Sequence, residues 1–415
     1  MTRTQIRSRG RDIHENHRAA TPLELLFDLT FVVAIAQAAA QLHHGIVEHH
    51  TWEALLGFVL AFAAIWWAWM NYTWFASAYD NDDAWFRVLT MVQMGGVLVL
   101  ATGIKGLFTG QYLAAVVGYV VMRLALCVQW LRAAWGDPGR RRTCLRYAFG
   151  VSLIQIGWVG FLLGCLAGLI SGGWLAILMI LLWICELAVP MWAERAGETP
   201  WHAHHIAERY GLMTIIVLGE CVLGATNAVG NMWQAHGWTF DLGLVGFSGM
   251  VLIFCLWWMY FLMPSGESLH LHRERAWGWG YGHFVLFAAT AAVGSGLEVV
   301  ADVLGAVENG AHLAEGASNG AHHGVSSLYA ISMVAIAEAT FVIALWALHR
   351  HATRSNARHL LPTLLCLGTI GLGPLAAFWG LPLAWSLLLL SLGPVALIIY
   401  HEHGRRHCTD HFAVR

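Results

Sequence analysis

The sequence predicts an all-α, polytopic integral membrane protein with about twelve transmembrane helices and little mass outside the bilayer. Hydrophobic residues make up 58% of the chain and charged residues 12%, and the mean hydropathy is +0.58. A soluble domain carries about twice that charged fraction. The apolar residues also form long, nearly uncharged runs, which a helix needs to cross about 30 Å of hydrocarbon. The 22 tryptophans and 10 tyrosines agree, because aromatic rings favour the headgroup boundary.

Twelve apolar segments separated by short polar links are the expected helices. Their approximate ranges are 22–42, 53–76, 84–104, 111–131, 147–170, 173–191, 204–228, 241–262, 279–300, 325–348, 360–379 and 382–400. We expect residues 1–20 to be a flexible cytoplasmic N-terminal tail and residues 403–415 a cytoplasmic C-terminal tail. Residues 21–191 are then the first six-helix half, and residues 199–402 are the second.

Lysine and arginine predict the orientation of these helices. With the N-terminus in the cytoplasm, positive charges should gather in the two tails and in every second link. All but two of the 23 Lys and Arg residues do so, the exceptions being Lys105 and Arg123. A missed or invented helix would break this alternation. Both termini are therefore expected on the cytoplasmic side.

The two halves resemble each other in places. Trp66-Trp67 recurs as Trp257-Trp258 at an offset of 191 residues, and Thr21-Pro22 recurs as Thr199-Pro200 at an offset of 178. These repeated motifs favour two parallel six-helix repeats, an arrangement found in transporters with the solute path between the halves. Chance similarity among tryptophan-rich helices is the alternative.

The first helix carries two carboxylates. Thr21, Pro22 and Glu24 form the pattern of a capping box with proline at the first helical position, which gives Glu24 a structural explanation. Asp28 lies one turn deeper on the same face, roughly 9 Å beyond the cap at about 1.5 Å per residue. An ionisable group at membrane depth needs a partner or a proton. We therefore interpret Asp28, with Glu24, as a candidate proton- or ion-coupling group.

An acidic link precedes the third helix. Asp80, Asp82 and Asp83 lie just before Arg87, which is the likeliest positive partner for Asp28 in the first half. The cluster is either a solvated cap, favoured by the helix dipole, or a charge network at the mouth of a cation or proton path.

The seventh helix adds further charges. Glu208 and Arg209 are expected in a network at its cytoplasmic end, where His204 and His205 are more typical of an interface than of a metal site. Glu220 lies near the middle of the span with no charged neighbour in sequence. Because burial disfavours the charged form of a carboxyl, Glu220 is a second candidate for proton coupling.

Other polar residues within the apolar segments are weaker candidates. Candidates for the substrate path are Asn71, Tyr72, Glu186, Tyr260, His283 and Glu338. Further isolated charges are Arg123, Glu298 and Asp302, and His43 belongs to a group of histidines on the predicted outer side that either bind metal, sense pH or are simply solvated. The eight cysteines show no metal-binding spacing. We expect no metal and no cofactor, and we find no P-loop and no HExxH motif that would indicate an enzyme.

Three motifs make the chain resemble the bacterial low temperature requirement protein A (LtrA) family. They are Thr-Pro-Leu-Glu-Leu-Leu-Phe-Asp-Leu-Thr-Phe-Val at 21–32, Asn-Tyr-Thr-Trp-Phe-Ala at 71–76 followed by the acidic link at 80–83, and Glu-Arg-Tyr-Gly-Leu at 208–212 continuing to Leu-Gly-Glu at 218–220. The resemblance covers nearly the whole chain. It implies a multi-pass protein of the bacterial inner membrane, and it supplies no substrate or reaction.

The leading functional hypothesis is a secondary transporter or permease for a small solute, coupled to protons or cations through membrane-embedded carboxylates. The alternatives are an ion channel with two six-helix repeats and an intramembrane enzyme or lipid-handling protein. Phe27-Asp28 resembles part of the Phe-Ser-Asp signature of two-repeat potassium channels, without its serine. The expected partners are the lipid bilayer and a small solute or ion, with a homo-oligomer left open and no nucleic acid.

Overall fold

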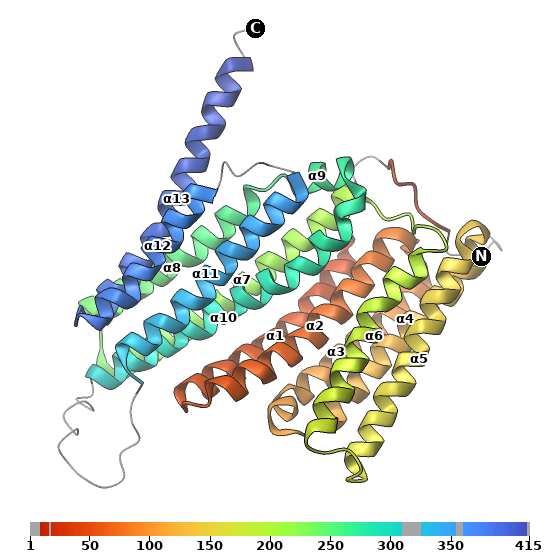
Figure 1. Ribbon diagram of the computed structural model, residues 1–415, viewed down its shortest axis with the longest axis horizontal. Helices are drawn as coiled ribbons and strands as arrows, with labels where there is room; N and C mark the ends of the chain where they lie inside the picture. The colour runs from red at the N-terminus through yellow and green to blue at the C-terminus, as the bar shows by residue number, and fades with distance from the viewer. Residues whose placement is uncertain (1–8, 16–17, 309–324, 354–359, 413–415) are drawn as a thin grey trace. The chain divides into compact units, whose positions relative to one another are not determined.

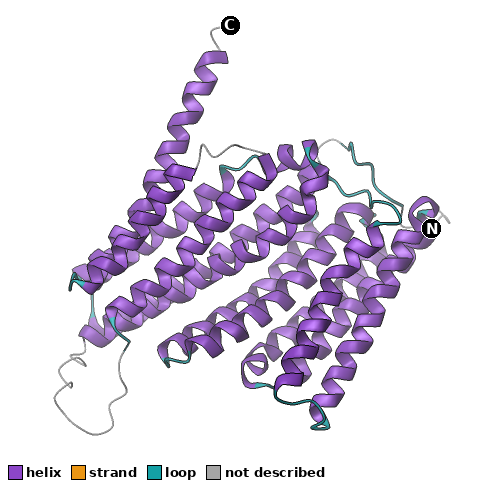
Figure 2. Cartoon of the chain, viewed as in Figure 1, coloured by secondary structure: helices purple, strands orange, loops and turns teal. Residues whose placement is uncertain are grey.

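The described part of the chain is built from helices alone. The computed structural model describes residues 9–15, 18–308, 325–353 and 360–412, and every regular element in these residues is a helix (Figure 2). Twelve of these helices are long and apolar enough to cross a membrane. The prediction of an all-α polytopic protein with about twelve transmembrane helices is therefore confirmed. The two-repeat arrangement stays a prediction.

The helices follow one another along the chain as Figure 1 labels them. The long helices are α1 (Pro22–Val47), α2 (Thr51–Tyr79), α3 (Ala84–Thr109), α4 (Leu113–Gly136), α5 (Arg141–Leu166), α6 (Gly173–Glu194), α7 (Ala203–His236), α8 (Phe240–Phe261), α10 (Ala276–Glu308), α11 (Ser327–Thr353), α12 (Leu360–Phe378) and α13 (Leu383–Phe412). A short helix, α9 (Ser265–Leu271), lies in the link between α8 and α10.

Side-chain caps start several of these helices where the sequence predicts them. The backbone N–H of Thr21 donates to the Glu24 carboxylate at 2.7 Å, and the N–H of Glu24 donates to the Thr21 hydroxyl at 3.3 Å. This is the reciprocal capping box expected before α1. Asp83 caps α3 by accepting from the N–H of Phe86, and α3 ends at Gly110 in the left-handed conformation that glycine tolerates.

The helices group into two compact units. Unit 1 comprises Met1–Ala38 and Leu56–Leu212, and unit 2 comprises Ala39–Leu55 and Met213–Arg415. The boundaries of these units fall within α1, α2 and α7. The division into halves at 21–191 and 199–402 stays a prediction.

Within unit 1, α3 and α4 approach each other closely (Figure 1). A Cβ atom at Gly118 of α4 would lie 2.4 Å from the backbone nitrogen of Leu100, and one at Gly103 of α3 would lie 2.3 Å from that of Ala115. Two backbones approach this closely only where the residues are small. In lipid the hydrophobic effect does not hold helices together, so van der Waals contacts of this kind provide the attraction. In unit 2, α10 packs on α11, and α12 and α13 pack together with α8 and α11.

The structure describes part of each segment that is expected to be a tail. Within the expected flexible segment 1–20, Arg11 donates from its backbone N–H to the carbonyl of Ala78 at 2.9 Å, and Arg18 is buried. Residues 1–8 and 413–415 lie outside the described residues. In the expected tail 403–415, α13 continues as helix to Phe412.

The close contact between α3 and α4 predicts that a larger residue at Gly118 destabilises the protein. Gly118→Ala should lower the stability of the purified protein by about 1–3 kcal/mol, because the added methyl group meets backbone rather than a side chain that can move. Thermal unfolding in detergent measures this. Gly95→Ala is the matched control on α3, since a Cβ there has nothing within 4 Å. Equal unfolding temperatures for the two variants would contradict the close helix contact.

Candidate functional site

One arginine joins the two carboxylates of α1. Arg209 lies in the first turns of α7, where its Nη1 is 3.0 Å from Glu24 Oε1 and its Nη2 is 2.5 Å from Asp28 Oδ1. All three side chains are fully buried in unit 1. Glu24 and Asp28 are one helical turn apart on the same face, so a single guanidinium reaches both. The positive partner of Asp28 is thus Arg209 and not Arg87.

Further donors complete this network around the two carboxylates. The indole N–H of Trp69 in α2 donates to Asp28 Oδ1 at 2.8 Å. His205 Nε2 lies 3.2 Å from Glu24 Oε1, and Arg18 Nη2 lies 3.8 Å from the same oxygen. We call Arg18, Glu24, Asp28, His205 and Arg209 the α1–α7 charge network.

The formal charges of this network balance, because two arginines face two carboxylates. A buried ion pair of this kind is strongly favoured over either partner alone, since removal of one charge leaves the other without compensation. The geometry therefore describes Asp28 and Glu24 as ionised groups held in place. Glu208, one residue before Arg209, instead faces outward and accepts from the backbone N–H of Ala20 at 3.2 Å.

The three aspartates of the acidic link before α3, Asp80, Asp82 and Asp83, lie in three different environments. Arg87 pairs with Asp82 at 2.7 Å with both side chains more than half exposed. Asp83 caps α3 and pairs with Arg132 of α4 at 2.7 Å. Asp80 is only 2% exposed. Burial, followed by repulsion from Glu24, raises the pKa of Asp80 to about 6.

A second buried ion pair lies in the centre of unit 1. Arg123 of α4 donates from Nη2 to Glu186 Oε2 of α6 at 2.7 Å. Trp67 donates to the same oxygen at 2.9 Å, and Gln155 of α5 donates to the other oxygen at 2.9 Å. Four helices thus meet at one carboxylate, and both of its oxygens are satisfied.

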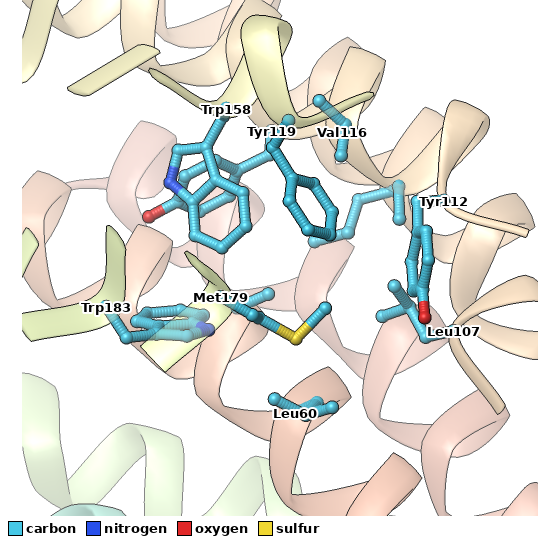
Figure 3. Close-up of a pocket in the computed structure, with 12 residues that line it drawn as sticks. Leu60, Leu107, Tyr112, Val116, Tyr119, Trp158, Met179 and Trp183 are labelled. Carbon is cyan, nitrogen blue, oxygen red and sulfur yellow. The ribbon is translucent and has the colours of Figure 1, made fainter. Parts of the chain in front are cut away.

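A small aromatic cavity of about 50 Å³ lies within unit 1 near this ion pair (Figure 3). Tyr119, Trp158 and Trp183 gather on one side of it, with Tyr112 opposite and Met179 between them. Tyr119 also lies one turn before Arg123, whose guanidinium carbon is 5.7 Å from the tyrosine ring. Its lining is almost wholly apolar, and apolar cavities of this kind stay dry, because a water molecule needs polar partners.

Unit 2 contains a cluster of carboxyls and histidine, formed by His43 of α1, Glu220 of α7, and Glu298 and Asp302 of α10. His43 Nε2 is 2.7 Å from Asp302 Oδ2, and its Nδ1 is 3.7 Å from Glu298 Oε2. Glu298 lies against α7, where a Cβ at Gly224 would be 2.0 Å from its carboxylate oxygen. Glu220 lies one turn before Gly224 on the same face of α7, which places its carboxyl near that of Glu298.

The remaining predicted residues are distributed over both units. In unit 1, Tyr72 is fully buried with its ring centroid 3.7 Å from that of Phe27, whereas Asn71 donates only to the carbonyl of Trp67. In unit 2, the Tyr260 hydroxyl is 3.2 Å from His283 Nε2. Glu338 of α11 is fully buried.

Several members of these sites were not singled out from the sequence. Trp69 and Gln155 supply donors to buried carboxylates and Arg132 supplies one to the half-buried Asp83, and nothing in their local sequence marks them among the many tryptophans and polar residues. Arg18 lies in a segment expected to be flexible. Among the described residues, no group of three or more His, Cys, Asp or Glu side chains is arranged to hold a metal ion.

The family model for the bacterial low temperature requirement A protein (LtrA) matches residues 19–394. The chain belongs to the LtrA family. The match includes Glu24, Asp28 and Arg209, so two motifs far apart in the sequence of this LtrA protein meet at one buried charge network.

A curated protein of Rhizobium meliloti (strain 1021), named uncharacterized protein RA0937, is 28% identical to this LtrA protein over 252 residues. The alignment spans 57% of this chain and 57% of the relative, so this LtrA protein covers somewhat more than half of that protein's length. No solved structure matches the chain.

The α1–α7 charge network predicts a large effect of Arg209→Met. The variant should lose about 3–5 kcal/mol of stability, because two buried carboxylates are left without their main counter-charge. Thermal unfolding of the purified protein checks this. Arg87→Met, which breaks an exposed pair, is the control and should unfold near the wild-type temperature.

A compensating variant sharpens this test. Adding Glu24→Gln and Asp28→Asn to Arg209→Met should recover part of the lost stability, since no uncompensated charge remains. If Arg209→Met and Arg87→Met behave alike, the network does not hold the fold together.

Asp80 predicts a pH dependence. Its pKa of about 6 lies above that of an unfolded aspartate, about 4, so the folded state binds the proton more tightly. The contribution of Asp80 is therefore most favourable at low pH and is lost as the pH rises from about 4 to about 6. Asp80→Asn should remove this part of the pH dependence of the unfolding temperature. Parallel curves for the variant and the wild type over this interval would contradict the assignment.

Proposed function

We propose that this LtrA protein is a secondary transporter of a small solute, coupled to protons or cations through the carboxyls of unit 2. The observation that carries the proposal is that Glu298 of α10 lies beside His43 and against Gly224 of α7, one turn from Glu220, within membrane-spanning helices. Two neighbouring carboxylates at membrane depth are costly when both are charged. Binding of a proton or a cation relieves this repulsion, and its release restores it.

The rest of the cluster supports exchange with the aqueous side. The exposed fraction of the side chain falls from 53% at Asp302 to 25% at Glu298 and 18% at His43. His43 lies between these two carboxylates and changes its own charge near neutral pH when unperturbed. The four residues thus provide a series of proton acceptors that leads from an exposed position to a half-buried one.

A cavity of about 470 Å³ beside this cluster suits the solute. It is lined by α7, α8 and α10, and Leu297 and Ala301 in its wall directly precede Glu298 and Asp302. Thr226 is one of the few polar residues that line it. Pockets of 300–1,000 Å³ with mainly apolar walls typically hold small molecules, so the proposed solute is small and largely apolar.

We assign different roles to the two units in this proposal. The α1–α7 charge network of unit 1 has compensated charges and serves as a fixed anchor, whereas the carboxyls of unit 2 take up and release the coupling ion. The arginine distribution further supports placing the protein in the bacterial cytoplasmic membrane with both termini in the cytoplasm.

Proton movement into proteoliposomes tests the coupling. Vesicles containing the protein and an internal pH-sensitive dye receive a pH gradient, with sodium, potassium or choline as the external cation. Wild type should move protons in a way that depends on the gradient, and Glu220→Gln and Glu298→Gln should lower the rate severalfold. Arg87→Met, far from the cluster in sequence and exposed, is the control and should keep the wild-type rate.

Two results would contradict the proposal. One is wild-type proton movement in both glutamine variants when they are folded. The other is an ion current that follows the voltage and is indifferent to the pH gradient, which would indicate a channel.

A further inference from the structure

Glu338, a buried carboxyl of unit 2, has no hydrogen-bond partner among the residues that the structure describes. Glu338 lies near the middle of α11 with an exposed fraction of 0%. Within the described residues, neither of its carboxylate oxygens has a hydrogen-bond partner, and it makes no ion pair. An ionised carboxylate in a low-dielectric interior carries a large energetic cost unless it is paired, and such a group takes up a proton instead.

Among the described residues, no positively charged side chain pairs with Glu338. The thiols of Cys255 in α8 and Cys366 in α12, both buried, are near enough to interact electrostatically with its carboxyl. From α10 and α13, which also pack in this part of unit 2, no described ionisable side chain acts on its carboxyl. Thiols are weak donors and weak acceptors, so they tolerate a neutral carboxylic acid better than they stabilise an anion.

Glu186 shows how the same chain stabilises an ionised carboxylate. It too is a fully buried glutamate within a membrane-spanning helix, and it receives donors from Arg123, Trp67 and Gln155 at 2.7–2.9 Å. Glu338 has none of these. Two glutamates in equally apolar segments are therefore in opposite environments.

We propose that Glu338 is a proton-binding site of unit 2, a neutral carboxylic acid at neutral pH that is separate from the Glu220–Glu298 pair. The site binds a proton in preference to a metal ion, since the described residues around it supply no group of three ligands. This protonation does not depend on transport; only a role as a second coupling group rests on the proposed function.

Infrared spectroscopy of the purified protein tests the site directly, because a protonated carboxyl absorbs at a higher frequency than a carboxylate. At neutral pH, Glu338→Gln should lose intensity in the band of protonated carboxyls. Glu186→Gln, the matched control, should leave that band unchanged and lose carboxylate intensity. Retention of the full band in Glu338→Gln would overturn the proposal.

A chemical probe makes the test independent of any variant. The acid O–H of a protonated carboxyl adds across a C=N bond of dicyclohexylcarbodiimide, and the resulting O-acylisourea rearranges to a stable N-acylurea with no group leaving. Peptide mass spectrometry of the wild-type protein should find this adduct on Glu338 and not on Glu186. Modification of Glu186 with Glu338 left intact would overturn the proposal.

The unfolding temperatures of two variants distinguish a neutral carboxylic acid from an ionised carboxylate. Glu338→Gln replaces a neutral group by a neutral group of the same shape and should leave the unfolding temperature near that of wild type. Glu186→Gln should lower it markedly, because Arg123 is left unpaired. The proton-flux assay is separate from all three measurements, so failure of the proposed transport and failure of this site give different results.

Discussion

The structure depends on one constraint, which is that a charge inside the apolar part of the protein must meet an opposite charge or be neutralised. Arg209 satisfies this constraint by pairing with both Glu24 and Asp28, and Arg123 satisfies it by pairing with Glu186. These contacts tie α1 to α7 and α4 to α6, because the members of each pair come from different helices. The charges therefore help to define which helix faces pack together.

The two units satisfy this constraint in different ways. In unit 1, Asp28 and Glu186 each have an arginine and an indole donor beside them. In unit 2, Glu298 lies against α7 one turn from Glu220, and neither carboxylate oxygen of Glu338 has a hydrogen-bond partner among the described residues. Compensated charges suit a fixed scaffold, whereas uncompensated carboxyls suit a group that gains and loses a proton. This contrast connects the packing of the helices to the proposed coupling.

Local sequence predicts local structure here, and it does not predict which residues meet across the fold. The Thr21–Glu24 capping box and the number of helices were predictable because each depends on neighbouring residues. Asp28 was recognised as needing a partner, but Arg209 lies 181 residues away, and the face of α7 that meets α1 is set by packing. Glu186 and Glu338 likewise look alike in sequence, since both are single glutamates within apolar helices, and only the helices around them distinguish the two.

The contrast between the compensated charges of the α1–α7 charge network and the protonatable carboxyls of unit 2 is tested most directly by counting the protons that the purified protein takes up when it is acidified from mildly alkaline to mildly acidic pH. A variant with Glu220→Gln and Glu298→Gln should take up fewer protons than the wild type. A variant with Glu24→Gln, Asp28→Asn and Arg209→Met should take up as many as its parent when both proteins also carry Asp80→Asn, because the pKa of Asp80, about 6, is itself raised by Glu24. The opposite order of the two variants would contradict the account.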